Sequence, residues 1–256
     1  MNLQNIKTLW LSDLHLGTKE SQSDELLKFL KSFPLMNGKY HLETVFLNGD
    51  ILDITNFDSK LFFKSHIKII KKFLDFSNRG VKIIYILGNH EYPLMPYFDS
   101  DETLIYKNIF VKKYHIHISK NNKKYLVIHG DQFDGIVRLH PFIYGLGDFL
   151  YTFIIKINFI LSKILHMLKL RPWSFSHWIK SKAKSAVKYI SDFERLIVEY
   201  SKKYNVDGVI CGHIHVPEDT VINGIRYINS GTFVEIKSCI VEDDDGKIEV
   251  LILDKC

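Results

Sequence analysis

The chain has 256 residues, 46% hydrophobic and 25% charged, which fits one large or two small globular domains and excludes a disordered or fibrous chain. Lysine and arginine exceed aspartate and glutamate by 34 to 29, and this charge of +5 excludes a histone-like basic excess while allowing an anionic partner. Three scattered cysteines argue against a disulfide framework and favour a reducing, cytoplasmic setting. Residues 1–7 lack a basic region followed by an apolar core, so we expect no signal peptide.

The first part of the chain, from residue 6 to about residue 90, alternates apolar runs with helix-like stretches. In chain order we predict a strand, a helix, a strand, a longer helix and a strand at Thr8–Leu11, Asp24–Phe33, Thr44–Leu47, Leu61–Asn78 and Val81–Leu87. Such alternation indicates parallel strands joined by crossover helices.

The last part of the chain consists mostly of predicted strands. A hairpin pairs Tyr114–Ser119 with Lys124–Ile128. After residue 205 we predict strands at Val206–Cys211, Asp219–Ile222, Ile225–Asn229, Phe233–Val241 and Lys247–Leu253. The fold class is therefore α/β, and residues 1–256 are predicted to form a single domain with two sheets.

Residues 136–205 interrupt this pattern. Residues 141–170 are dense in Phe, Tyr, Ile and Leu, but their uncharged runs are far shorter than the roughly 18 residues that a membrane-spanning helix needs. We predict one or two short apolar helices, a break at Pro172, and an amphipathic helix reaching about Tyr204. The apolar stretch would suit a pocket for acyl chains. The alternative interpretations are a pair of core helices or a dimer contact.

Metal-ligand side chains directly follow five of the predicted strands. The segments are Asp13-Leu14-His15, Gly49-Asp50, Gly88-Asn89-His90-Glu91, His129-Gly130-Asp131 and Gly212-His213-Ile214-His215. Five strand ends that converge would bring these side chains to one rim of a sheet. Such a collection can hold two divalent metals, an arrangement suited to the hydrolysis of phosphate esters.

The individual residue types indicate how the ligands would be divided. A pair of divalent ions roughly 3.5–4 Å apart needs a bridging carboxylate, and Asp50 is the predicted bridge. If the backbone is strand-like, Asp13 and His15 face the same way and suit one metal. By the same alternation His213 and His215 face together, and each could reach a different metal.

The remaining predicted ligands are Asn89, through its amide oxygen, and His129, which completes the second site. Nitrogen and oxygen ligands without cysteine favour Mn²⁺, Fe²⁺, Zn²⁺ or Co²⁺ over Mg²⁺. Metals lower the pKa of bound water, and the resulting hydroxide would attack phosphorus. His90 and Asn89 are the predicted catalytic residues, with His90 protonating the leaving group or stabilising charge at phosphorus. Asp131 is predicted to orient a histidine ligand.

The ordered segments resemble the calcineurin-like metallophosphoesterase superfamily, whose blocks are D-x-H, G-D, G-N-H-[DE], a lone H and G-H-x-H. The resemblance covers residues 6 to about 235. It implies an αββα sandwich of two mixed β-sheets flanked by helices, and it implies two divalent metal ions as cofactors. It assigns one metal to Asp13, His15, Asp50 and His215, and the other to Asp50, Asn89, His129 and His213.

A narrower likeness is to the UDP-2,3-diacylglucosamine pyrophosphohydrolase-like branch. The segments that carry it are 129–134, 146–151, 186–194 and 209–217. This branch implies release of UMP and 2,3-diacylglucosamine 1-phosphate during lipid A synthesis, usually with Mn²⁺. It also implies that residues 136–205 form a helical cap insertion that holds acyl chains. A lipid-linked nucleotide substrate places the protein peripherally on the cytoplasmic face of the inner membrane.

Two positions depart from the branch. His90 stands where its best-known enzymes carry Arg, so this position is similar to the wider superfamily instead, and Thr232 stands where Asp is common. The first departure weakens the assignment of the substrate. A metallophosphodiesterase of another lipid-linked or soluble nucleotide is the alternative. A membrane-surface adaptor on a phosphoesterase scaffold is the alternative from another class.

A nuclease is the remaining alternative among enzymes. It should show a basic groove with aromatic stacking positions, whereas the aromatic residues here gather in the apolar insertion, so nucleic acid is not the expected partner. The sequence leaves the oligomeric state open.

Overall fold

The computed structural model describes residues 3–98, 102–134 and 175–253, with the side chains of the last range described from residue 187 onward. The chain divides into two compact units. The first comprises residues 1–131 and 197–256, and the second comprises residues 132–196.

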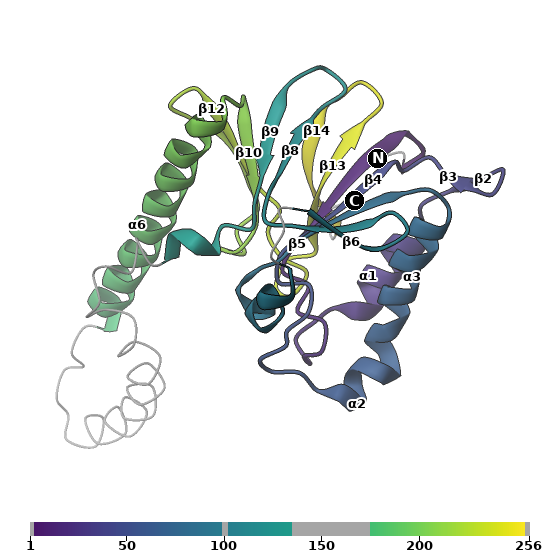
Figure 1. Ribbon diagram of the computed structural model, residues 1–256. Helices are drawn as coiled ribbons and strands as arrows, with labels where there is room; N and C mark the ends of the chain where they lie inside the picture. The colour runs from purple at the N-terminus through teal and green to yellow at the C-terminus, as the bar shows by residue number, and fades with distance from the viewer. Residues whose placement is uncertain (1–2, 99–101, 135–174, 254–256) are drawn as a thin grey trace. The chain divides into compact units, whose positions relative to one another are not determined.

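The first unit is built on a seven-stranded mixed sheet with the strand order β14-β13-β1-β4-β5-β7-β6 (Figure 1). Its strands are β1 (Ile6–Leu11), β4 (Thr44–Asn48), β5 (Lys82–Ile86), β6 (Glu102–Tyr106), β7 (Ile109–Lys112), β13 (Ser238–Asp243) and β14 (Ile248–Ile252). The inner strands β1, β4, β5 and β7 run parallel, and the outer strands on each side pair antiparallel.

A second sheet of five strands has the order β11-β12-β10-β9-β8. Its strands are β8 (His115–Ile118), β9 (Lys124–Val127), β10 (Gly208–Cys211), β11 (Glu218–Ile222) and β12 (Ile225–Asn229). Strand β10 runs parallel to both of its neighbours, β9 and β12. A small hairpin of β2 (Leu35–Met36) and β3 (Lys39–Tyr40) stands apart from both sheets.

Helices α1 (Ser23–Lys31) and α3 (Ile67–Asn78) lie together along the large sheet (Figure 1). Each buries one apolar stripe, which includes Leu26 and Leu30 of α1 and Phe73 and Phe76 of α3, because an amphipathic helix gains stability by packing that stripe on a sheet. The remaining helical segments are η1 (Leu3–Asn5), α2 (Ser59–Leu61), the π-helical turn η2 (Phe62–His66), η3 (Asn89–Tyr97), η4 (Asp131–Phe133), α6 (Phe175–Ser201) and η5 (Lys202–Tyr204).

The central strands of the large sheet are buried on both faces. Along β1, Leu9 and Leu11 belong to the core beneath the helices, whereas Trp10 belongs to the core between the two sheets, where its ring stacks on Phe46 at 5.2 Å. Successive side chains of a strand point to opposite faces, so a strand covered on both sides reads as a nearly continuous apolar run. This is why β1, β4 and β5 could be predicted from apolar runs in the sequence.

The predicted α/β fold class with two sheets and packed helices is confirmed. The predicted strand Phe233–Val241 begins only at Ser238, since residues 232–237 form a loop closed by the Ser238 N–H, which donates to the Thr232 carbonyl oxygen at 3.2 Å. Residues 135–174, with most of the predicted cap insertion 136–205, lie outside the described part, and the cap stays a prediction. No helix in the described ranges combines the length and apolarity needed to cross a bilayer.

Candidate dinuclear metal site

The predicted ligands follow the carboxyl ends of five strands. Strands β1, β4 and β5 run parallel in the large sheet, and β9 and β10 run parallel in the second. Backbone hydrogen bonds join these ends: the Asp13 N–H donates to the Gly49 carbonyl at 3.0 Å, and the Gly212 N–H donates to the His129 carbonyl at 3.1 Å. Parallel strands place their carboxyl ends at one edge of a sheet, and that edge is where ligands bind in open α/β folds.

Five of the predicted ligands have left-handed backbone conformations. The φ angles are 52° at Asp13, 46° at His15, 53° at Asp50, 73° at His213 and 57° at His215. Residues other than glycine rarely adopt this region, and such conformations cost about 1–3 kcal/mol each and gather at functional sites. The ligand pairs are therefore aimed by sharp turns after the strands, and not by the strand-like alternation expected from the sequence.

One cluster consists of Asp13, His15 and His215, which offer ligand atoms within 4.8 Å of one another. Asp13 Oδ1 lies 3.2 Å from His215 Nε2, while Asp13 Oδ2 accepts hydrogen bonds from Ser12 Oγ and from the His213 N–H. Burial lowers the pKa of His15 despite the nearby carboxylates, which favours the neutral imidazole that a metal requires.

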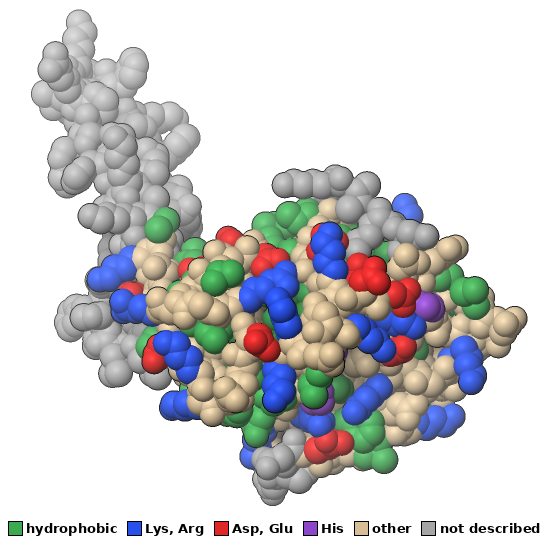
Figure 2. Space-filling model, turned by 90° about the horizontal axis from the view of Figure 1, so that it is seen from above, with side chains coloured by type: hydrophobic (Ala, Val, Ile, Leu, Met, Phe, Trp, Pro, Cys, Tyr) green, Lys and Arg blue, Asp and Glu red, His purple; other side chains and the backbone are tan. Residues whose placement is uncertain are grey.

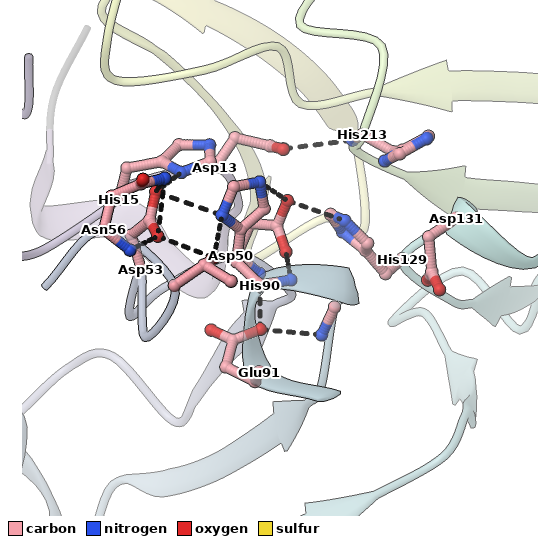
Figure 3. A network of polar contacts seen from close by, with 12 residues as sticks. Asp13, His15, Asp50, Asp53, Asn56, His90, Glu91, His129, Asp131 and His213 are labelled. Atoms are coloured by element: carbon pink, nitrogen blue, oxygen red, sulfur yellow. Dashed lines mark hydrogen bonds and ion pairs between the residues drawn. The ribbon is translucent and has the colours of Figure 1, made fainter. Parts of the chain in front are cut away.

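A second cluster consists of Asp50, His129 and His213. His129 Nδ1 donates to the Asn48 carbonyl oxygen at 2.9 Å, so Nε2 is left facing Asp50 Oδ2 at 3.4 Å (Figure 3). Burial opposes the charge on both groups, yet their pairing holds the pKa of Asp50 well below its usual range and raises the pKa of His129 to about 10. Strong mutual perturbation of this kind is typical of functional sites.

Unpartnered buried atoms test whether these residues fit metal ions. Asp13 Oδ1, His15 Nε2, Asn89 Oδ1 and His129 Nε2 are buried and form no hydrogen bond within the described residues, although Asp13 Oδ1 and His129 Nε2 have the ion-pair contacts to His215 and Asp50 given above. An unsatisfied buried polar atom costs about 1–3 kcal/mol, so His15 Nε2 and Asn89 Oδ1, which have neither kind of contact, require an explanation. All four are oxygen or nitrogen atoms of the kinds that coordinate divalent cations, and the residues therefore fit a dinuclear site.

Asp50 and His90 meet at the middle of the site (Figure 3). Asp50 Oδ1 accepts a hydrogen bond from the His90 N–H at 2.9 Å, and His90 Nε2 lies 3.9 Å from Asp50 Oδ2. The His90 ring stands edge-on to the His15 ring at 4.6 Å, and 26% of the His90 side chain is exposed. A partly exposed imidazole beside the clusters suits a group that meets substrate.

Asp53 is a site residue that the sequence reading missed. Its Oδ2 lies 3.0 Å from His90 Nδ1 and 3.4 Å from His15 Nδ1, so one carboxylate orients both rings. Burial opposes its ionisation, but His90 and the Asn56 N–H lower the pKa of Asp53 to about 2. The only indication of Asp53 in the sequence was an acidic residue three positions after Asp50.

Glu91 anchors the turn that carries Asp50. Its carboxylate is fully buried and accepts hydrogen bonds from the N–H groups of Asp50, Ile51, Leu52 and Gly88 and from the Tyr85 hydroxyl, at 2.6–2.9 Å. Burial, together with the Asp50 charge, raises the pKa of Glu91, whereas the donors favour the carboxylate.

Two other singled-out residues have defined contacts. Asp131 accepts a hydrogen bond from the Tyr92 hydroxyl, and the Asn48 carbonyl, not Asp131, is the hydrogen-bond partner of His129. Thr232, the departure from the branch pattern, is buried and donates its hydroxyl to the Asp13 carbonyl oxygen at 3.0 Å. Thr232 thus supports the turn that aims Asp13.

Glycine is required at two positions beside the ligands. Gly49 has a φ of +85°, and a Cβ there would fall on the His129 ring. A Cβ at Gly88 would fall on Asp50 Oδ1. The close approach of backbone to ligand side chains explains why glycine precedes both Asp50 and Asn89.

Comparison with known proteins adds an independent finding. The family model described as calcineurin-like phosphoesterase matches residues 6–217. None of the proteins with curated functions matches the chain.

The chain is also similar to solved structures over nearly its whole length. An archaeal phosphodiesterase shares 15% identity with a TM-score of 0.45, covering 96% of this chain and 99% of its own. Yfce, a phosphoesterase from E. coli, shares 11% identity with a TM-score of 0.44, covering 96% and 99%. Vps29 from Entamoeba histolytica, complexed with zinc, shares 14% identity with a TM-score of 0.41, covering 95% and 96%.

Proposed function

Because the chain belongs to the calcineurin-like phosphoesterase family and is thus a metal-dependent hydrolase of phosphoester bonds, we propose that its substrate is a lipid-linked nucleotide diphosphate. The candidate substrate is UDP-2,3-diacylglucosamine, cleaved to UMP and 2,3-diacylglucosamine 1-phosphate. The hydrolase chemistry is supported by the buried ligand atoms of Asp13, His15, Asn89 and His129, which form no hydrogen bond within the described residues.

The residues of the site have separate tasks in this reaction. Two divalent ions, when bound, supply Lewis acidity and an activated water. Asp13, His15 and His215 would hold one ion, and Asn89, His129 and His213 the other, with Asp50 shared between them. His90 would give a proton to the leaving oxygen, and Asp53 holds the His90 ring through Nδ1 so that Nε2 faces the clusters.

The lipid part of the proposal is supported by sequence. The segment between His129 and His213 contains the apolar residues 141–170, and a pocket for acyl chains needs such side chains. The lysines at positions 180, 182, 184 and 188 would suit phosphates or anionic headgroups. We further propose a peripheral position on the cytoplasmic face of the inner membrane, with Mn²⁺ as the metal.

A water-soluble phosphodiester or nucleotide is the second candidate substrate. The observation that favours it is a pocket of about 510 Å³ next to His15, His90 and His215, whose lining includes the charged side chains of Lys19, Glu20 and Asp58. A nucleic acid is less suited, because on the face shown in Figure 2 the described Lys and Arg side chains are interspersed with Asp and Glu.

Hydrolysis assays separate these candidates. The Mn²⁺-loaded protein is expected to release UMP from UDP-2,3-diacylglucosamine with a much higher kcat/KM than from UDP-N-acetylglucosamine, which lacks the long chains. Equal turnover of both would overturn the lipid proposal and leave the hydrolase intact. A matched assay with bis(p-nitrophenyl) phosphate measures the activity of the metal site alone. Absence of activity in that assay would overturn the assignment of the protein as a hydrolase.

A further inference from the structure

A pocket opens from the metal clusters toward two loops of the first unit. Its inner wall is formed by His15, His90 and His215, and its volume is about 510 Å³. Lys19 and Asn56, both exposed, also line it. A pocket that begins at the reacting centre and continues outward offers room for the part of a substrate beyond the phosphorus that reacts.

The loop that carries Lys19 is fixed to the metal site. The Gly17 N–H donates to His66 Nδ1 at 2.8 Å, and the Gly17 carbonyl accepts from the Asp58 N–H at 2.9 Å. The Thr18 hydroxyl donates to the carbonyl oxygen of His15, itself a predicted ligand, at 2.9 Å. Residue 19 therefore has a defined place relative to the clusters.

Lys19 is the cation among the residues that line this pocket. It is exposed, and within the described ranges it forms no ion pair or hydrogen bond. The acids of the pocket are partly engaged, since Asp53 is paired with His15 and His90, and Asp58 accepts from the Leu61 N–H at 3.0 Å. Glu20 also lines the pocket, so a ligand there would meet a carboxylate as well as the Lys19 ammonium.

We propose that Lys19 binds a second phosphate of the substrate, adjacent to the phosphate held at the metals, and makes the site selective for diphosphates. This rests on the proposed function, because it takes the ligand of the pocket to be the substrate of the metal site. An ammonium–phosphate hydrogen bond in a partly solvated pocket gives about a tenfold preference.

Binding measurements test the assignment without requiring turnover. Calorimetry on the Mn²⁺-loaded protein gives the dissociation constants of UMP and of α,β-methylene-UDP, a diphosphate that cannot be cleaved between its phosphates. The wild type is expected to bind the diphosphate about tenfold more tightly than the monophosphate. Lys19→Gln is expected to abolish that ratio and Lys19→Arg to retain it.

Lys28→Gln is the matched control, because it removes the same charge from an exposed position on α1 away from the pocket. It should keep the wild-type ratio. An unchanged ratio in Lys19→Gln would overturn the role of Lys19, since metal chelation alone would then account for the preference. Equal binding of both nucleotides by the wild type would also overturn it. A protein that shows the Lys19-dependent ratio but hydrolyses nothing would instead contradict the proposed function.

Discussion

Single residues divide into those that face the metal clusters and those that hold them in place. The two groups differ in how visible they are in the sequence. Asp50 and His129 lie in spaced, ordered motifs, whereas the carboxylate of Asp53 and the backbone carbonyl of Asn48 act through contacts that no motif specifies. The residues that gather in the two candidate clusters could thus be predicted from motifs, and the groups that orient them could not.

Glu91→Gln is expected to destabilise the protein and weaken metal binding. The amide would present an N–H₂ group to donors that now meet a carboxylate, at a cost of about 2–4 kcal/mol in the free energy of unfolding. Chemical denaturation measures this cost. Glu249→Gln, at an exposed ion pair with Lys247, is the control and should change stability by less than about 1 kcal/mol. Equal stability of the two variants would refute the anchoring role.

His90→Asn should lower kcat while leaving metal content unchanged. Loss of a general acid typically costs about 10²–10⁴ in rate, and the loss is smaller when the leaving group needs no proton. The expected drop is therefore larger for an alkyl-linked phosphodiester than for bis(p-nitrophenyl) phosphate. An identical drop for both substrates would show that His90 does not protonate the leaving oxygen.

At the scale of elements, strands buried on both faces could be predicted from apolar runs, and the more exposed β8 and β11 could be predicted because turn signals flank them, whereas β6 and β7 were missed. Strand β4, with the burial of Val45, Phe46 and Leu47, reads as a continuous apolar run. Strand β6 at the edge is mostly exposed, so its pattern resembles a loop. The apolar pair Phe233-Val234 read as a strand, but the chain loops back there because Thr232 is tied to Asp13.

A buried polar junction between β8 and β13 fixes the two sheets to each other. Glu242 of β13 is 1% exposed and accepts hydrogen bonds from His117 Nε2 at 2.8 Å, the Lys120 N–H at 2.7 Å and the Thr8 hydroxyl at 2.9 Å. Burial opposes its charge, but these partners lower the pKa of Glu242 below its ordinary value of 4.5. The histidine pair of β8 is thus part of the inter-sheet contact, and not merely a surface feature.

Glu242→Gln is expected to lower the free energy of unfolding by about 1–3 kcal/mol at pH 7. A carboxyl whose pKa is depressed on folding contributes fully above its unfolded pKa and loses that contribution as the pH falls through its folded pKa. The gap between wild type and variant should therefore shrink below about pH 4.5. Urea denaturation at several pH values measures the gap. Asp244→Asn, at a surface pair with His41, is the control, and a gap independent of pH would refute the role of the Glu242 charge.

At the scale of the whole molecule, the candidate metal site draws residues from both sheets, so we expect metal binding and folding to be coupled. The predicted ligands follow strands β1, β4 and β5 of one sheet and β9 and β10 of the other, and the unfolded chain cannot present them together. Metal at 100 times its dissociation constant should add about 2.7 kcal/mol per site to the free energy of unfolding.

The melting temperature is therefore expected to rise when Mn²⁺ is added and to fall again when a chelator removes it. The Asp50→Ala variant should show less of this rise, because it loses the carboxylate shared by the two ions. Thermal unfolding followed by circular dichroism detects the shift. Equal shifts in the variant and the wild type would mean that the added metal stabilises the chain at some other place.

Titration of the metal-free protein with Mn²⁺, followed at once by calorimetry and by hydrolysis of bis(p-nitrophenyl) phosphate, tests the two-metal hydrolase most directly. We predict a stoichiometry of two ions per chain and hydrolysis that rises as the second ion binds. In Asp50→Ala we predict a stoichiometry below two and loss of hydrolysis. Full hydrolysis with no metal bound, or full hydrolysis by Asp50→Ala, would contradict it.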